Sequence, residues 1–323
     1  MRRRWGSIPT RWCSATMRWW AASQRGRRKW FPRRSRRRAA RGWGSSSLSW
    51  RWRSSCGCSS CAEGQPMRGT HRAIVLKVRD YGEGHRLVDL FTEESGLERA
   101  FAPSGRRSQR RFAGAFDPMT LLSATVDRPP GRGLVRLKEA RVLNGWPGIR
   151  SSLEGIARGA YLVDLARALL REAKPEPEIF ALLVAGLQRL ESGCFRAWHR
   201  LAYELGLLAA FGALPVFDAC VRCQRRSTGE QARFSPALGG LLCPRCGPRW
   251  GRHDTVLPRR GLLAAAALAE AGSAVEVFER ADHLPDDSAA AKALTAALTR
   301  FVEAQVGRRL PSLDFLTELE EPL

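Results

Sequence analysis

The pattern of apolar and polar residues divides the chain into three stretches of different character. From Ala73 to Leu143, apolar residues alternate with polar ones over short runs separated by Gly, Pro, Asp and Ser. This pattern is typical of β-strands joined by turns. From Ser151 onward apolar residues recur at every third or fourth position, which predicts amphipathic helices. Residues 1–66 show neither period.

The alternating stretch predicts five short strands. Their expected ranges are 73–79, 86–92, 97–102, 119–126 and 134–143. Along the first strand, Ile74, Leu76 and Val78 should face one side, and Val75, Lys77 and Arg79 the other. Gly96 is expected to turn the chain with a positive φ. Five short strands with a longer excursion between the third and fourth predict a small closed barrel such as an OB-fold, although an SH3-like barrel has the same strand count.

The remainder predicts a mainly helical domain, which makes the fold class α+β multidomain. We expect helices after a capping box at Ser151-Ser-Leu-Glu154, after Pro177, from about Phe195 to Gly212, and near 259–271 and 288–306. The expected domains are an OB-fold barrel over 67–148 and a helical domain over 149–323. A cysteine-containing module at 217–250 is inserted in the helical domain.

Four cysteines indicate a metal site. Cys220-Val-Arg-Cys223 is followed after nineteen residues by Cys243-Pro-Arg-Cys246. Two C-x-x-C pairs at this separation can close one tetrahedral zinc site, because each pair supplies two thiolates from a tight turn. Four thiolates leave no open coordination position, so the predicted Zn²⁺ is structural and does no catalysis.

The charge of the chain is unevenly distributed. The net charge is +23, and residues 1–66 hold 17 Lys and Arg against one acid, Glu63, together with eight of the 11 Trp. Because apolar residues other than Trp and Ala are nearly absent there, this low-complexity segment cannot form a core. We expect it to be disordered or the product of a wrong start, with Met67 as the true first residue. A nucleic-acid-binding arm and a targeting peptide are the alternatives.

A second basic feature lies within the predicted barrel. Between Arg99 and Phe116 the chain has five arginines and no acid. A flexible arginine loop on a small barrel is suited to a phosphate backbone, although such a loop can also serve solubility alone. The candidate nucleic-acid-binding residues are Lys77, Arg79, Arg86, Arg99, Arg106, Arg107, Arg110, Arg111, Arg136 and Lys138. Residues 220–260 add nine arginines against two acids, a second basic surface.

Several blocks of the chain resemble the RecO family of bacterial DNA recombination and repair mediators. Residues 67–88 are similar to the opening of that family. Its later blocks are matched, in order and with the right gaps, by Thr92-Glu-Glu-Ser-Gly96, by Gly105-Arg-Arg-Ser-Gln-Arg-Arg-Phe112, and by 116–118, 203–208, 218–223, 239–246 and 309–313. The resemblance covers about 67–316. One departure is Gln224, which stands where a zinc knuckle often has Gly, whereas Gly247 keeps the pattern.

The resemblance implies an N-terminal OB-fold, a helical C-terminal domain and a zinc module. It implies a protein that is not an enzyme, that binds single- and double-stranded DNA, and that anneals complementary strands. It further implies work with RecR, contact with the C-terminal tail of single-stranded DNA-binding protein, and help in loading RecA onto DNA coated by that protein. Such a mediator is expected in the bacterial cytoplasm, associated with the nucleoid. The sequence contains no run of 18 apolar residues, so no membrane-spanning helix is predicted.

Two other classes of function share some of these features. A zinc enzyme acting on nucleic acid would need an open coordination position, and the five histidines show no ligand spacing with one another. No P-loop, nucleophile elbow or paired-carboxylate signature is present. An RNA-binding factor built from an OB barrel and a zinc ribbon would share the same features, so the residues alone leave it open.

Overall fold

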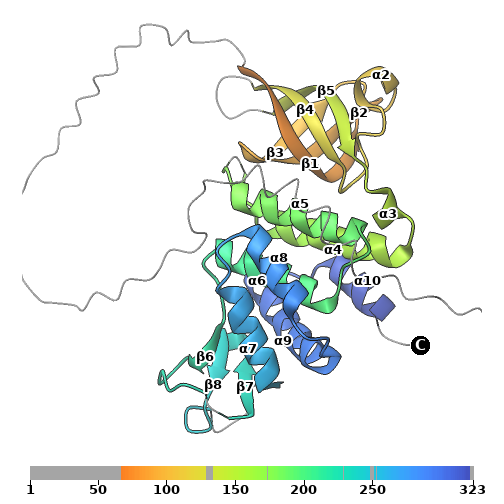
Figure 1. Cartoon of the computed structure of the whole chain (residues 1–323). Helices are drawn as coiled ribbons and strands as arrows, with labels where there is room; N and C mark the ends of the chain where they lie inside the picture. The colour runs from red at the N-terminus through yellow and green to blue at the C-terminus, as the bar shows by residue number, and fades with distance from the viewer. Residues whose placement is uncertain are drawn as a thin grey trace, which may run out of the picture.

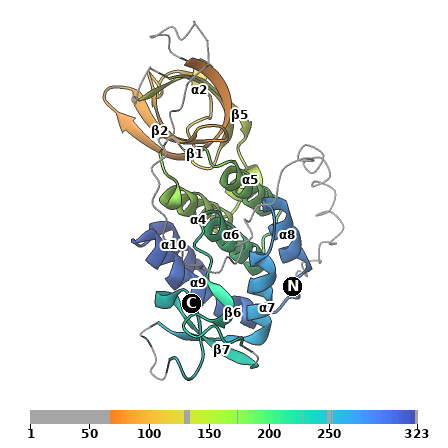
Figure 2. The same cartoon turned by 90° about the vertical axis from the view of Figure 1, so that its left-hand side faces the viewer.

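The computed structural model describes residues 67–128, 134–172, 174–227, 229–247, 251 and 253–320. The expectation for residues 1–66 lies outside these described residues. A β-barrel stands at one end of the molecule, helices form the middle, and a small sheet lies at the opposite end (Figures 1 and 2). The observed architecture is therefore the predicted combination of a barrel and a mainly helical part.

Five strands form the barrel. They are β1 (Met67–Tyr81), β2 (His85–Thr92), β3 (Gly96–Ala102), β4 (Leu121–Arg128) and β5 (Val135–Asn144). The strands close in the order β1-β2-β3-β5-β4, and β3 runs parallel to β5 while the other neighbours are antiparallel. This is the order of an OB-like barrel. A short helix, α2 (Gln109–Phe112), lies in the connection between β3 and β4.

The first strand departs from its predicted alternation. A register shift separates Val75 and Lys77, which marks a β-bulge at Leu76. Because a bulge inserts one extra residue, the residues after it face the side opposite to the one that alternation predicts. Ile74 and Leu76 lie in the core shared with the helices, whereas Val78 packs against the barrel interior. The prediction that these three residues share one face was wrong.

The barrel and the helices share a continuous core. Val75, Val88 and Leu90 fill the barrel interior, while residues on its outer surface join the helical core. Phe91 of β2 meets Phe180 edge to face, with ring centroids 5.4 Å apart. One side of the barrel is therefore covered by helices.

Eight helices of the described chain follow the barrel. They are α3 (Pro147–Arg150), α4 (Leu153–Leu169), α5 (Pro177–Glu191), α6 (Ala197–Ala210), α7 (Arg259–Ala269), α8 (Ala274–His283), α9 (Ser288–Val306) and α10 (Pro311–Glu320). Helices α4 and α5 lie directly beneath the barrel (Figure 1). The predicted capping box begins at Ser151, but the N-cap of α4 is Ser152, whose hydroxyl accepts from the Gly155 N–H. Helices α8 and α10 were not predicted.

The small sheet carries the cysteine motifs. Its strands are β6 (Val216–Cys220), β7 (Gln231–Ser235), β8 (Gly240–Leu242) and β9 (Thr255–Pro258), in the order β6-β8-β7-β9. Phe234 stacks on Phe217 at 5.7 Å and meets Phe301 of α9 edge to face at 6.5 Å. These rings attach the sheet to the helices. Over the described residues, no helix is long and apolar enough to cross a membrane.

Candidate nucleic-acid interface and metal centre

The outer face of the barrel carries a row of basic and aromatic side chains. Arg79 of β1 lies opposite Leu87 of β2, Leu87 opposite Phe101 of β3, and Phe101 beside Arg136 of β5. Directly paired residues face the same side of a sheet. The register therefore aligns two arginines from the candidate set on either side of an aromatic ring, across four strands. We call Arg79, Leu87, Phe101 and Arg136 the barrel row.

An aromatic cluster lies at the end of this face. The ring of Phe101 meets Tyr81 edge to face at 6.0 Å and His85 at 5.2 Å. Tyr81 is 54% exposed, a large value for an aromatic residue on a folded domain. Exposed rings beside cations are the usual platform for stacked bases in proteins that bind single strands. Sequence reasoning did not name these rings, because their contact depends on the register of β1, β2 and β3.

The predicted arginine loop lies against the same end of the barrel. The Ser104 N–H donates to Nδ1 of His85 at 2.9 Å, and the Arg106 N–H donates to the Gly84 carbonyl at 3.1 Å. Glu83, Gly84, Arg106 and Arg107 line a hollow of about 430 Å³. The loop thus joins the aromatic cluster to form one surface.

The arginines of this surface differ in their partners. Arg106 forms an ion pair with Asp80 at 3.7 Å, and Arg86 with the same carboxylate at 3.5 Å. Arg111 donates to the Pro103 carbonyl at 2.8 Å, with its guanidinium carbon 4.9 Å from the centre of the Phe112 ring. Arg107 and Arg110 are exposed and form no ion pair with any described residue. The last two therefore have the most donors left for a ligand.

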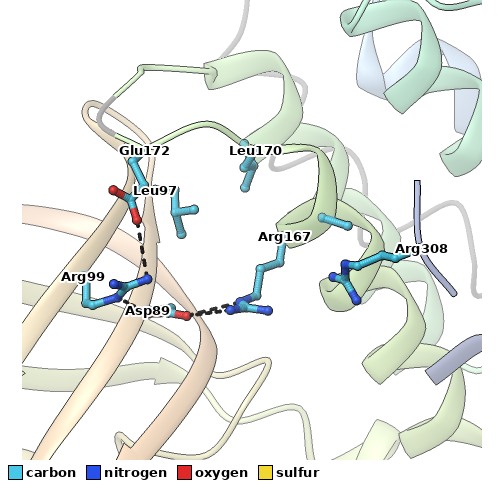
Figure 3. A pocket seen from close by; sticks show the side chains of 8 residues that line it. Asp89, Leu97, Arg99, Arg167, Leu170, Glu172 and Arg308 are labelled. Carbon is cyan, nitrogen blue, oxygen red and sulfur yellow. Dashed lines mark hydrogen bonds and ion pairs between the residues drawn. The ribbon is translucent and has the colours of Figure 1, made fainter. Parts of the chain in front are cut away.

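Two other candidates lie near the helices. Nη2 of Arg79 lies 3.2 Å from a carboxylate oxygen of Asp89, and Nε of Arg99 lies 3.3 Å from the other oxygen. Arg167 of α4 also reaches Asp89, at 3.0 Å (Figure 3). The structure therefore places Arg79 and Arg99 where the barrel meets the helices, with part of their charge already balanced.

The remaining candidates belong to the outer surface of the barrel. Lys77 lies opposite Asp89 and is exposed. Lys138 of β5 forms an ion pair with Asp127 at 2.9 Å, whereas Arg136 is exposed and forms no ion pair with a described residue. Lys77, Arg107, Arg110, Arg111 and Arg136 are thus the candidates without a described acidic partner, and Arg111 is held by the Pro103 carbonyl and the Phe112 ring instead.

The four predicted metal ligands converge at the end of the molecule opposite the barrel. The sulfur atoms of Cys220, Cys223, Cys243 and Cys246 all lie within 4.8 Å of one another. The Sγ atoms of Cys223 and Cys243 are 3.7 Å apart. A tetrahedral zinc with bonds of about 2.3 Å needs sulfur atoms about 3.8 Å apart. The cluster therefore has the dimensions of a site for one tetrahedral metal ion.

The protonation of the thiols is consistent with a cation at this site. Burial raises the pKa of Cys220, but hydrogen bonds from the backbone at Cys243, Cys223 and Arg222 outweigh it and lower the pKa to about 6. Hydrogen bonds with the thiols of Cys223 and Cys243 raise the pKa of Cys246 to about 12. Four thiols this close do not all ionise near neutral pH without added positive charge, which a metal ion supplies.

The two cysteine turns differ at the residue after the second cysteine. Gln224 has φ +62, the left-handed region that favours glycine, and its N–H donates to the Cys220 carbonyl at 2.9 Å. Gly247 occupies the same place in the second turn, where its N–H donates to the Cys243 carbonyl at 3.1 Å. Gln224 therefore adopts the left-handed conformation, which costs a residue with a side chain about 1 kcal/mol or more relative to glycine.

Comparisons with known proteins cover almost all of the described chain. The family model "Recombination protein O N terminal" matches residues 67–146, and "Recombination protein O C terminal" matches residues 150–314. A protein named DNA repair protein RecO from a strain of Anaeromyxobacter is 40% identical over 247 residues, which cover 76% of this chain and 94% of the relative. The protein of the same name from Myxococcus xanthus is 39% identical, with 76% and 96% covered. That from Pelobacter propionicus is 35% identical over 250 residues.

Proposed function

The chain belongs to the RecO family of DNA repair proteins, and from this premise we propose that it is a recombination mediator rather than an enzyme. It binds single- and double-stranded DNA and anneals complementary strands. With RecR, it helps RecA to load onto DNA that is coated by single-stranded DNA-binding protein. Four thiolates around one metal ion leave no coordination position for an activated water, which supports a role without catalysis.

The observation that carries this proposal is the barrel row beside the aromatic cluster. Arginines neutralise backbone phosphates without regard to sequence, and an exposed ring stacks on any base. Arg79 and Arg136 lie on either side of Phe101, so one surface offers both contacts. A strand held in this way keeps its pairing edges free, and reduced phosphate repulsion lets a complementary strand approach. Annealing follows from these two effects.

The metal has a structural role in this proposal. Cys220, Cys223, Cys243 and Cys246 would hold Zn²⁺, since their sulfur atoms have the spacing of a four-thiolate site. When bound, the ion links the two cysteine turns. Arg222 assists, because its guanidinium donates to the Cys246 carbonyl at 3.2 Å across the two turns.

A groove on the helices offers a place for the tail of single-stranded DNA-binding protein. It measures about 1160 Å³ and lies between α4, α6, α9 and α10. Six cationic residues and four acidic ones line it, together with the apolar side chains of Phe195, Leu313 and Leu319. A peptide with carboxylates and an apolar end would be complementary to this lining. Loss of binding of the tail peptide in Lys292→Glu would support this placement, and unchanged binding would contradict it.

The test of the function is annealing of complementary oligonucleotides coated with single-stranded DNA-binding protein. We expect Phe101→Ala and Arg136→Ala each to slow annealing, and the double variant to slow it most. Arg68→Ala is the matched control, because Arg68 is exposed on the barrel but already paired with Asp127 at 3.2 Å. Annealing by the double variant at the rate of the control would argue against the barrel row.

Two further measurements separate the rival functions. Labelled DNA incubated with the protein, with and without a chelator, should stay intact, and cleaved or deaminated products would indicate an enzyme. In competition between DNA and RNA single strands of the same sequence, we expect DNA to compete at least as well. A clear preference for RNA would favour the RNA-binding alternative.

A further inference from the structure

A pocket of about 380 Å³ lies where the barrel meets the helices, and three arginines from three separate elements line it (Figure 3). Arg99 comes from β3, Arg167 from α4, and Arg308 from the segment between α9 and α10. The apolar part of the lining is Leu97, Ala168 and Leu170, and its carboxylates are Asp89 and Glu172. The three arginines are separated by 68, 141 and 209 positions along the sequence, and the fold brings them to one cavity.

The position of Arg308 is fixed by its neighbours. Gly307 ends α9 with φ +71, and Leu310 is completely buried. Ser312, in the first turn of α10, donates from its hydroxyl to the Asp164 carboxylate of α4 at 2.9 Å. Asp164 lies about one helical turn before Arg167. These contacts hold the segment that carries Arg308 against α4.

The pocket keeps unused donors for an anion. Asp89 accepts from Arg99 at 3.3 Å and from Arg167 at 3.2 and 3.0 Å, and Glu172 accepts from Arg99 at 3.4 Å. A guanidinium has five N–H donors, so Arg99 and Arg167 keep several. Arg308 is exposed and forms no ion pair with any residue that the structure describes. A phosphate oxygen in the pocket would therefore meet N–H groups from more than one arginine.

The pocket continues the candidate DNA surface. The pairing that sets the barrel row places Lys77, Asp89 and Arg99 opposite one another in the next row toward the helices. Two residues along a strand are about 7 Å, so this row follows the barrel row closely. Glu172 forms an isolated parallel β-bridge with Leu97 of β3, and this contact marks where the surface passes from the barrel to the helices.

We propose that this pocket binds a backbone phosphate of a DNA strand that leaves the barrel and crosses onto the helices. The inference rests on the proposed function and adds a contact made by the helical part of the chain. Arg308 supplies the main contact, and Arg99 and Arg167 share the remaining oxygens. A single strand that occupies both surfaces is longer than one that covers the barrel alone.

The experiment measures binding of labelled single-stranded DNA of two lengths to the full chain. An oligonucleotide of about 4 nucleotides, the shortest site size of a single OB fold, covers the barrel alone, and one of about 16 nucleotides, the longest, can extend past the barrel row to the pocket. The variant is Arg308→Ala. Its matched control is Arg309→Ala, since Arg309 is the next residue and is also exposed, but is paired with Asp314 at 2.7 Å. Thermal unfolding of both variants confirms that they remain folded.

We expect Arg308→Ala to weaken binding of the longer strand by about threefold to tenfold and to leave the shorter one unchanged. The slope of log affinity against log salt for the longer strand should become shallower by about 0.7, the value for one lost phosphate contact. Arg309→Ala should behave as the unchanged protein at both lengths.

Three results would overturn the inference. The first is equal binding of the longer strand by the two variants, and the second is an equal loss at both lengths. The third is unchanged DNA binding together with weaker binding of a carboxylate-rich peptide, which would assign the pocket to a protein partner. If the unchanged protein bound neither length, the proposed function would fail as well, and this outcome is distinguishable from the other three.

Discussion

The carboxylate of Asp89 on β2 accepts two hydrogen bonds from the guanidinium of Arg167 on α4, at 3.2 and 3.0 Å. The same carboxylate receives Arg79 and Arg99, and its side chain is only 5% exposed. One buried charge thus links the barrel to the helices and keeps three guanidinium groups together. Without it, those groups would repel one another.

Replacing Asp89 should therefore destabilise the protein. We expect Asp89→Asn to lower the free energy of unfolding by about 3 kcal/mol, the usual cost of removing one partner from a buried ionic group. Denaturation by urea, followed by circular dichroism, measures the change. Asp80→Asn is the control, because Asp80 is 59% exposed and its pairs with Arg86 and Arg106 are screened by water. Equal losses in the two variants would contradict this account of the junction.

The left-handed residue in the first cysteine turn predicts a stabilising substitution. Gln224 has φ +62, so Gln224→Gly should raise the free energy of unfolding of the metal-loaded protein by about 0.5–1 kcal/mol. The adjacent Arg225 is not among the described residues with positive φ, so Arg225→Gly should lower it by a similar amount. Urea midpoints of the two variants check the opposite signs. A decrease in both would show that the turn is not strained.

Loss of one thiolate should abolish tight metal binding. We expect the unchanged protein to contain one Zn²⁺ per chain and Cys223→Ser to contain almost none, since structural sites of this kind need all four ligands. Elemental analysis of the purified proteins gives the ratio. The control is Arg245→Ala. Arg245 lies between Cys243 and Cys246 but is not a metal ligand, so this variant should keep one Zn²⁺ per chain. A full equivalent in Cys223→Ser would rule out a site made of these four cysteines.

In the arginine loop, Arg107 should contribute more to DNA binding than Arg106. The double change Arg106→Ala and Arg107→Ala should weaken DNA binding and make its salt dependence shallower. Of the single variants, Arg107→Ala should account for most of the loss, because Arg106 already pairs with Asp80 at 3.7 Å. Titrations at several salt concentrations give both quantities. A salt slope that stays unchanged in the double variant would remove the loop from the interface.

Features that depend on neighbouring residues could be predicted from the sequence. The two C-x-x-C turns are local, and the quartet they imply is present as a cluster. The five strands follow from alternation and turn residues, and their number and barrel closure agree with the expectation. The start of helix α8 also has a local signal in the sequence, the pattern Ser-x-x-Glu, in which the Ser273 hydroxyl accepts from the Glu276 N–H.

Features that depend on distant residues could not be predicted in the same way. The bulge at Leu76 arises from the register of β1 with β2, and alternation along β1 alone gives the wrong faces for Val78. The sequence gives no sign that Arg79 and Arg99 have a partner. The fold brings both to the carboxylate of Asp89, which also pairs with Arg167. The aromatic cluster of Tyr81, His85 and Phe101 needs the pairing of three strands.

The parallel pairing of β3 with β5 also constrains the order of events during synthesis. The barrel cannot close until the end of β5, Asn144, has emerged from the ribosome, because β5 pairs with both β3 and β4. Helices α4 and α5 emerge next, and their apolar side chains pack on Ile74 and Phe91 of the barrel. Since N-terminal units generally fold first on the ribosome, the closed barrel provides a ready surface on which the nascent helices assemble.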